Sequence, residues 1–195
     1  MSEGYVSLVV EGSLDETISK KLISKYANHI KIRTTYSMGS RSEIRKRINK
    51  YNQAARVYPF WVLVDLNQDE CPPILIKEWV PHKNPQLFLR VAVRQVEAWL
   101  LADRQAFARF LGVGLNRIPV NPDAVTKSPS LIMSVSRKSR KRDIKESIPP
   151  LGTTAKRGPD YNGQLSRFVN GGWDAERARK HSSSLDRTIR TLQRL

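Results

Sequence analysis

Two short apolar runs, each followed by a carboxylate, constrain the fold of this chain most. Residues 6–10 and 60–64 are rich in β-branched side chains, and Glu11 and Asp65 follow them directly. Runs of this length and composition are typical of strands buried in a parallel sheet. In open α/β sheets, ligands bind beyond the carboxyl ends of the strands, so Glu11 and Asp65 are expected to converge on one crevice. The pair predicts a site for a divalent cation.

Hydrophobic periodicity predicts alternating strands and helices over the first half of the chain. Further strands are expected over residues 29–34 and 87–93, and helices over 14–26, over 40–55 and from 96 onward. Polar residues 67–69 and the proline pair at 72 and 73 predict a loop after the strand at 60–64. This order of elements favours an α/β fold with a small, mainly parallel β-sheet flanked by helices.

The pattern changes beyond residue 103 to short helical pieces separated by proline, glycine and serine. We therefore expect an α/β core over residues 1–103 and a basic α-helical C-terminal extension over 104–195, packed on the core. A length of 195 residues suffices for one domain of ordinary size with a buried core. The single cysteine, Cys71, excludes an internal disulfide and any CxxC zinc site.

The positive charge of the chain is concentrated in its second half. The net charge is +16; residues 1–103 carry 15 basic and 11 acidic side chains, whereas residues 104–195 carry 19 and 7. This imbalance predicts a polyanionic partner, most simply nucleic acid. The alternative for the densest run is a solvated or disordered charged loop. The residues expected to contact phosphates are Arg137, Lys138, Arg140, Lys141, Arg142, Lys156 and Arg157.

The N-terminal segment does not have the pattern of a secretory signal. Glu3 precedes the first apolar run, and no basic segment comes before it. No stretch approaches the roughly 18 consecutive apolar residues that a membrane helix needs. We therefore expect a cytoplasmic protein without a membrane partner.

Five segments together resemble a known family. They are VEGSLDE after the first apolar run, VLVDLNQDECPP after the second, VEAWLLAD at 96–103, GPDYN at 158–162 and the closing SSSLDRTIRTL. In this order and spacing, the chain resembles over most of its length the Toprim fold, and within it the small stand-alone Toprim-like proteins of the DUF4276 type. Nucleases associated with overcoming-lysogenisation-defect ATPases are related to this group.

The resemblance implies a magnesium or manganese site. In Toprim enzymes a glutamate acts as acid or base and a DxD pair holds Mg²⁺, so Glu11 would be the general acid/base and Asp65 the first metal ligand. The chain departs from the pattern at Asn67, which stands where the second aspartate is expected. Asp69 and Glu97 could supply the missing carboxylate. The expected metal ligands are thus Glu11, Asp65, Asn67, Asp69 and Glu97, with Mg²⁺ or Mn²⁺ as the cofactor.

These features favour a metal-dependent phosphodiesterase, a Toprim nuclease acting on DNA or RNA with DNA preferred. The resemblance further implies a role in anti-phage defence or DNA repair beside an ABC-type or SMC-like AAA ATPase. Because the chain has no GxxxxGK[ST] loop, any ATP dependence would come from that partner. Asn67 favours an alternative, a non-catalytic Toprim module that binds nucleic acid or regulates the ATPase. A phosphatase of the haloacid-dehalogenase kind fits less well, because Asp65 follows the third expected strand instead of the first.

Each candidate carboxylate also has a structural alternative. Glu11 could cap the helix that follows it, and Asp69 could be an ordinary polar loop residue. Glu97 could pair with Arg90 or Arg94 instead of joining a metal site. Asp103 is expected to be the N-cap of a helix over residues 104–111.

Overall fold

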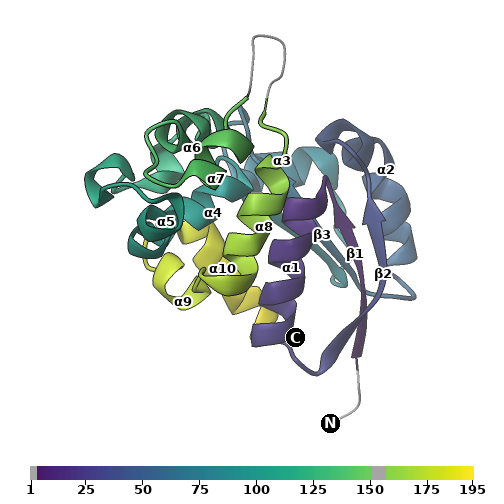
Figure 1. Ribbon diagram of the computed structural model, residues 1–195. Coiled ribbons are helices and arrows are strands. Elements are labelled where there is room, and N and C mark those ends of the chain that lie inside the picture. The colour runs from purple at the N-terminus through teal and green to yellow at the C-terminus, as the bar shows by residue number, and fades with distance from the viewer. Residues whose placement is uncertain (1–3, 151–156) are drawn as a thin grey trace. The chain divides into compact units, whose positions relative to one another are not determined.

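The computed structural model describes residues 4–150 and 157–195 (Figure 1). The chain divides into two compact units, Met1–Val93 with Arg187–Leu195, and Arg94–Asp186. The division thus falls earlier than the expected boundary at residue 103, and the last residues of the chain belong to the first unit.

A four-stranded parallel sheet forms the centre of the first unit. Its strands are β1 (Gly4–Val10), β2 (Ile30–Ser37), β3 (Phe60–Asp65) and β4 (Leu87–Ala92). They lie in the order β2-β1-β3-β4, and each neighbouring pair is parallel. The central strands β1 and β3 are almost entirely buried, as their apolar sequences predict. The expected α/β fold with a mainly parallel sheet is confirmed.

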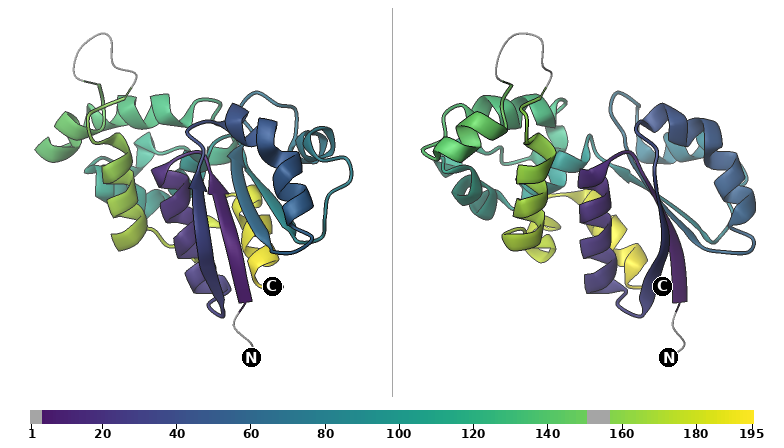
Figure 2. Two further views of the ribbon diagram at one scale, coloured as in Figure 1. Left: turned by 90° about the vertical axis from the view of Figure 1, so that its right-hand side faces the viewer. Right: turned by 45° about the vertical axis from the view of Figure 1, so that its right-hand side comes forward.

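Helices cover both faces of this sheet. Figure 2 shows α1 (Ser13–Tyr26) on one face and α2 (Arg41–Ala54) on the other. The helix α3 (Pro72–Trp79) shares the face of α2, because the buried side chains of both helices belong to one apolar cluster with β3 and β4. Both faces of β1 and β3 are therefore closed to solvent, and their carboxyl ends are left as the accessible edge.

The expected loop after β3 spans residues 66–71, and Pro72 and Pro73 end it by beginning α3. Proline at the first helical positions sacrifices no helical hydrogen bond, and its fixed φ already suits a helix. The helix then buries Leu75 and Trp79 against the sheet. The proline pair thus marks the start of a helix after the β3 loop.

The second unit is helical. Its helices are α4 (Val96–Ala102), α5 (Arg104–Leu111), α6 (Ser128–Ser136), α7 (Arg142–Ser147), α8 (Tyr161–Gly171) and α9 (Ala175–Ala178), with short 3₁₀ turns at Leu115–Arg117 and Pro122–Ala124. The helix α10 (Ser183–Leu192) crosses the boundary between the units. Phe107, Phe110 and Phe168 form an aromatic cluster with ring centroids 4.9–5.9 Å apart. Every residue of α4 is buried, so this helix lies at the centre of the unit.

None of the helices within the described ranges has both the length and the apolar character that a bilayer crossing requires.

Candidate functional site

Glu11 and Asp65 flank the point where the strand order of the sheet reverses. From β1 the chain moves outward to β2, and it then returns past β1 to form β3 on the other side. The reversal therefore lies between β1 and β3, and their parallel register brings their carboxyl ends to one edge. Crevices of this kind are the usual ligand sites of open α/β sheets. Glu11 directly follows β1, and Asp65 is the last residue of β3.

The Glu11 side chain reaches across to β3. The backbone N–H of Asp65 donates a hydrogen bond to Oε1 of Glu11 at 3.3 Å. The helix α1 has Gly12 as its N-cap residue, and the Gly12 N–H donates to Oδ2 of Asp15 at 3.1 Å. Asp15 therefore provides the side-chain contact at this helix start, whereas Glu11 joins the ends of two neighbouring strands. The two expected catalytic residues thus lie side by side.

Arg41, which sequence reasoning did not select, belongs to the same edge of the sheet. It is the first residue of α2, and its guanidinium forms an ion pair with Asp69. The guanidinium also lies over the ring of Trp79, 4.9 Å from the centroid. Burial lowers the pKa of Arg41, whereas the nearby carboxylates of Glu11 and Asp65 raise it. The positive charge of Arg41 therefore lies near the carboxylates of Glu11, Asp65 and Asp69.

The backbone conformation at residue 67 helps to explain why asparagine occupies this position. Its φ is +54°, and among the residues that the structure describes it is the one non-glycine with positive φ. Short polar side chains such as Asn and Asp adopt this left-handed conformation more readily than other residues do. The turn therefore favours Gly, Asn or Asp at this position, and the backbone conformation alone does not distinguish the amide from the carboxylate.

The oxygen atoms at this edge suit a magnesium or manganese ion in their chemistry. Within residues 4–150 and 157–195, no group of three or more His, Cys, Asp or Glu side chains is arranged to hold a metal. Mg²⁺ is commonly held by one or two carboxylates, with waters and substrate phosphates completing its shell. Glu11 and Asp65 provide the two carboxylates that such a site needs, and Asp69 is engaged with Arg41.

Glu97 lies in the second unit, where its carboxylate is buried with 3% of the residue exposed. The hydroxyl of Tyr161 donates to Oε1 of Glu97 at 3.2 Å, and a guanidinium nitrogen of Arg157 lies 3.7 Å from the same oxygen. Burial raises the pKa of Glu97, and Arg157 partly opposes this effect. The expectation that Glu97 joins the metal site stays a prediction. Glu97 forms an ion pair with Arg157, whereas the sequence suggested Arg90 or Arg94.

The buried Glu97 carboxyl predicts a pH-dependent stability. Because its pKa in the folded protein lies above the ordinary value of 4.5, the folded state holds this proton more tightly than the unfolded state. Its contribution to the unfolding free energy is fully present below the unfolded pKa and is lost as pH rises through the folded pKa. Glu97→Gln does not titrate and keeps an oxygen for Tyr161, so it should gain stability relative to the wild type as pH rises.

Urea unfolding at about pH 5 and about pH 8 measures this effect. Glu146→Gln is the matched control, because Glu146 is exposed and pairs with Arg142 on the surface. A stability difference between Glu97→Gln and wild type that does not change with pH would contradict the assignment.

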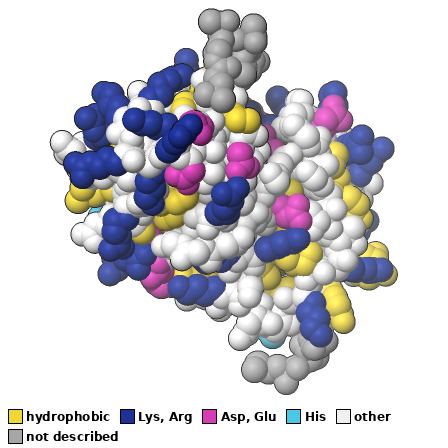
Figure 3. Space-filling model, in the orientation of Figure 1, with side chains coloured by type: hydrophobic (Ala, Val, Ile, Leu, Met, Phe, Trp, Pro, Cys, Tyr) yellow, Lys and Arg dark blue, Asp and Glu magenta, His cyan; other side chains and the backbone are white. Residues whose placement is uncertain are grey.

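The expected phosphate-contacting residues of the second unit are mostly exposed. Arg137, Lys138 and Arg140 follow α6, and Arg142 begins α7 with an exposed ion pair to Glu146 at 2.8 Å. The ammonium of Lys141 donates to the carbonyl oxygen of Phe110 at 3.0 Å. Figure 3 shows Lys and Arg side chains spread over the face of the molecule in view.

The remaining two candidates differ from this run. Arg157 stacks on the ring of Tyr161, 4.8 Å from its centroid, and also faces Glu97. Lys156 lies outside the described residues. A role in nucleic-acid binding stays a prediction for the whole set.

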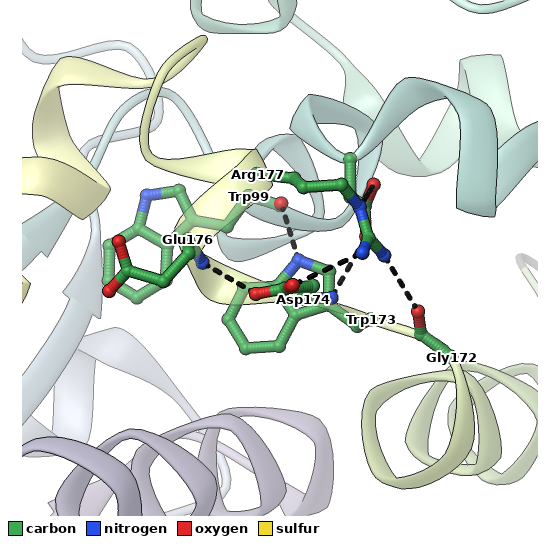
Figure 4. A network of polar contacts seen from close by, with 7 residues as sticks. Trp99, Gly172, Trp173, Asp174, Glu176 and Arg177 are labelled. Atoms are coloured by element: carbon green, nitrogen blue, oxygen red, sulfur yellow. Dashed lines mark hydrogen bonds and ion pairs between the residues drawn. The ribbon is translucent and has the colours of Figure 1, made fainter.

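Asp103 is the centre of a polar network in the second unit. Although it stands at the N-cap position of α5, its side chain makes no cap hydrogen bond. Its carboxylate instead accepts two hydrogen bonds from Arg177, at 2.8 and 2.9 Å, and one from the Asp174 N–H at 2.8 Å. Figure 4 shows Arg177 beside Asp174 and Gly172, with the indole of Trp173 directed at Trp99. This network holds α9 against α4 and is structural.

Comparison with protein-family models, with curated proteins and with solved structures finds no match for this chain.

Proposed function

We propose that this protein is a Mg²⁺- or Mn²⁺-dependent phosphodiesterase that acts on nucleic acid, with Glu11 and Asp65 at its catalytic centre. The observation that carries the proposal is the contact between these residues at the point where the strand order reverses, with Oε1 of Glu11 3.3 Å from the Asp65 nitrogen. Carboxylates delivered to this edge by neighbouring strands provide the hard oxygen ligands that these cations prefer.

The charged residues at this edge of the sheet would have different roles in hydrolysis. Asp65 and Glu11 would hold the cation, and Glu11 would also accept or donate the proton that moves during hydrolysis. When bound, the cation would polarise the phosphodiester and activate water for attack. Arg41, which lies near these carboxylates, would attract the phosphate of the substrate and limit its repulsion by them.

The resemblance to Toprim proteins supports the same activity and extends it. It points to an ABC-type or SMC-like AAA ATPase as the partner, in anti-phage defence or DNA repair in the cytoplasm. The net charge of +16 supports a nucleic-acid substrate, because such a charge favours binding to phosphate backbones.

Cleavage of plasmid DNA, linear duplex, single-stranded DNA and RNA by the purified chain tests the proposal. We expect cleavage with Mg²⁺ or Mn²⁺, none in EDTA, and a loss of at least about 100-fold in Glu11→Gln, because the amide can neither exchange the proton nor supply charge to the cation. The variant, purified in parallel, also controls for a contaminating nuclease. Equal cleavage by wild type and Glu11→Gln would refute the proposal.

A second candidate function is a non-catalytic module that binds nucleic acid or regulates the ATPase. The ion pair between Arg41 and Asp69 favours it, because a cation of the protein already balances part of the acidic charge at the edge. Asn67, in place of a second aspartate, favours it as well. Salt-sensitive binding of nucleic acid without cleavage by the chain and its ATPase partner together would establish this function.

A further inference from the structure

The positive charge of the first unit is concentrated in one continuous segment. Residues 29–58, which form β2 and α2 with their flanking loops, contain eight Lys and Arg and one Glu. The other residues up to 93 contain six basic and eight acidic side chains. The net charge of the whole first half is small, because acidic residues before and after β1, in α1, in α3 and around the β3 loop cancel this excess.

Aromatic rings lie within this basic segment and are open to solvent. Tyr36 on the edge strand β2 is 40% exposed, and Tyr58 just before β3 is 48% exposed. The Tyr36 ring lies 5.9 Å from that of Tyr51 on α2 and 6.4 Å from that of the buried Phe60. Tyr36 therefore packs against Tyr51 and Phe60 on one side, while the residue stays partly exposed to solvent.

Two arginines complete the surface. The guanidinium of Arg33 lies over the ring of Tyr58, 4.2 Å from the centroid. Arg47 on α2 lies close enough to Tyr51 to lower the pKa of its hydroxyl, against the larger effect of burial, which raises it. We call Arg33, Tyr36, Arg47, Tyr51 and Tyr58 the β2–α2 surface.

A register shift in the sheet helps to form this surface. Val6 aligns with Ile32 and Ser7 aligns with Thr34, so β2 contains one extra residue, Arg33. Such a bulge reverses the alternation of the side chains that follow it. Tyr36 thereby lies opposite Val9, on the sheet face that α2 and Phe60 share.

The β2–α2 surface leads toward the candidate catalytic residues. β2 is parallel to β1, so its carboxyl end lies at the same edge as Glu11. Just beyond β2, the Gly39 N–H donates to the carbonyl oxygen of Glu11 at 2.9 Å, and Arg41 follows two residues later. A ligand that lies along β2 would therefore meet Arg41 and the carboxylate pair at its end. All of these residues belong to the first unit.

We propose that the β2–α2 surface binds single-stranded nucleic acid and guides it to Glu11 and Asp65. Exposed rings set among cations match single strands, whose unstacked bases can stack on tyrosine while the phosphates contact arginine. The bases of a duplex are stacked on each other and cannot use the rings in this way. The inference rests on the proposed function and deepens it, because it names the form of the substrate.

Binding of a fluorescently labelled oligo(dT) of about a dozen nucleotides, measured by anisotropy in EDTA, tests the inference without any cleavage. Arg33→Gln combined with Arg47→Gln should weaken binding at least about tenfold and reduce the slope of log K against log salt by about 1.4, since each phosphate contact on a single strand contributes about 0.7. Tyr58→Ala should weaken binding by about tenfold and leave that slope unchanged, because stacking releases no counterions.

The matched control replaces two lysines of α1, on the opposite face of the sheet, in the variant Lys20→Gln with Lys25→Gln. This variant loses the same charge and should bind the oligonucleotide within about twofold of wild type. Equal losses in the two double variants, or a preference for duplex that Tyr58→Ala does not alter, would overturn the inference. If the variants change binding as expected but the wild type cleaves no nucleic acid, the proposed nuclease activity is refuted and the proposed binding role of the β2–α2 surface is retained.

Discussion

Asp65→Asn should reduce metal-dependent cleavage by at least about 100-fold, which corresponds to about 2.7 kcal/mol in the activation barrier. Binding of the same nucleic acid in EDTA should stay within about twofold of wild type. The two results differ because Asp65 is proposed to serve the chemistry, whereas the basic residues are proposed to provide the affinity. Cleavage rates and anisotropy on one substrate, measured with the same preparations, give both quantities.

The size of this effect follows from the position of Asp65. It ends β3 and its backbone nitrogen contacts Glu11, so it stands at the edge of the sheet where the strand order reverses. Asparagine has nearly the same shape but carries no charge, and a neutral amide is a much weaker ligand for a divalent cation. The fold should be kept, and an unchanged thermal melting curve would verify this.

Glu70→Gln is the matched control for Asp65→Asn. Glu70 lies in the same loop after β3, is exposed, and loses the same charge on substitution. Its cleavage rate should stay close to that of wild type. If both substitutions reduce cleavage equally, the effect comes from the overall charge of the loop, and the assignment of Asp65 as a metal ligand would be wrong.

The position of the carboxylate pair could be predicted from sequence because it depends on local rules. Short β-branched runs predict buried strands, and parallel strands bring their carboxyl ends to one edge. The apolar runs before Glu11 and Asp65 therefore sufficed to place both residues. The order of the strands, which puts the reversal between β1 and β3, needed the structure.

The partners of the charged residues could not be predicted in the same way. Arg41 and Asp69 are separated by 28 positions, and nothing in their local sequence links them. The start of α2 after Ser40 was the available signal, because helices that follow parallel strands begin at the edge that carries the ligand site. Glu97 and Arg157 likewise meet only through the packing of the second unit.

Asp103 shows how a correct position can accompany a different interaction. The sequence placed it at the start of α5, where a carboxylate would ordinarily accept a hydrogen bond from the helix. In the folded unit its two oxygens face Arg177 and the Asp174 N–H, on a segment more than 70 positions away. The ion pair decides the orientation because a buried carboxylate requires compensation beyond what one cap hydrogen bond provides.

Arg177→Met should therefore lower the unfolding free energy by about 2 to 3 kcal/mol. Asp103 is almost fully buried, with 2% of its side chain exposed, and the substitution removes two hydrogen bonds and the opposite charge from it. We expect less than the full cost of breaking a buried pair, because Arg177 is 48% exposed and water can enter where its guanidinium lay. Methionine keeps much of the apolar stem, so the loss reports mainly on charge and hydrogen bonding.

Arg167→Met is the matched control for this effect, because Arg167 pairs with Asp160 at a similar distance, 2.7 Å, while both side chains are exposed. An exposed pair of this kind contributes at most about 1 kcal/mol, so its loss should change the urea midpoint little. The difference between the two variants then measures what burial of the Asp103 carboxylate adds to the interaction. Equal midpoints would mean that Asp103 finds other compensation when Arg177 is absent, and that the network around Trp99 does not depend on this ion pair.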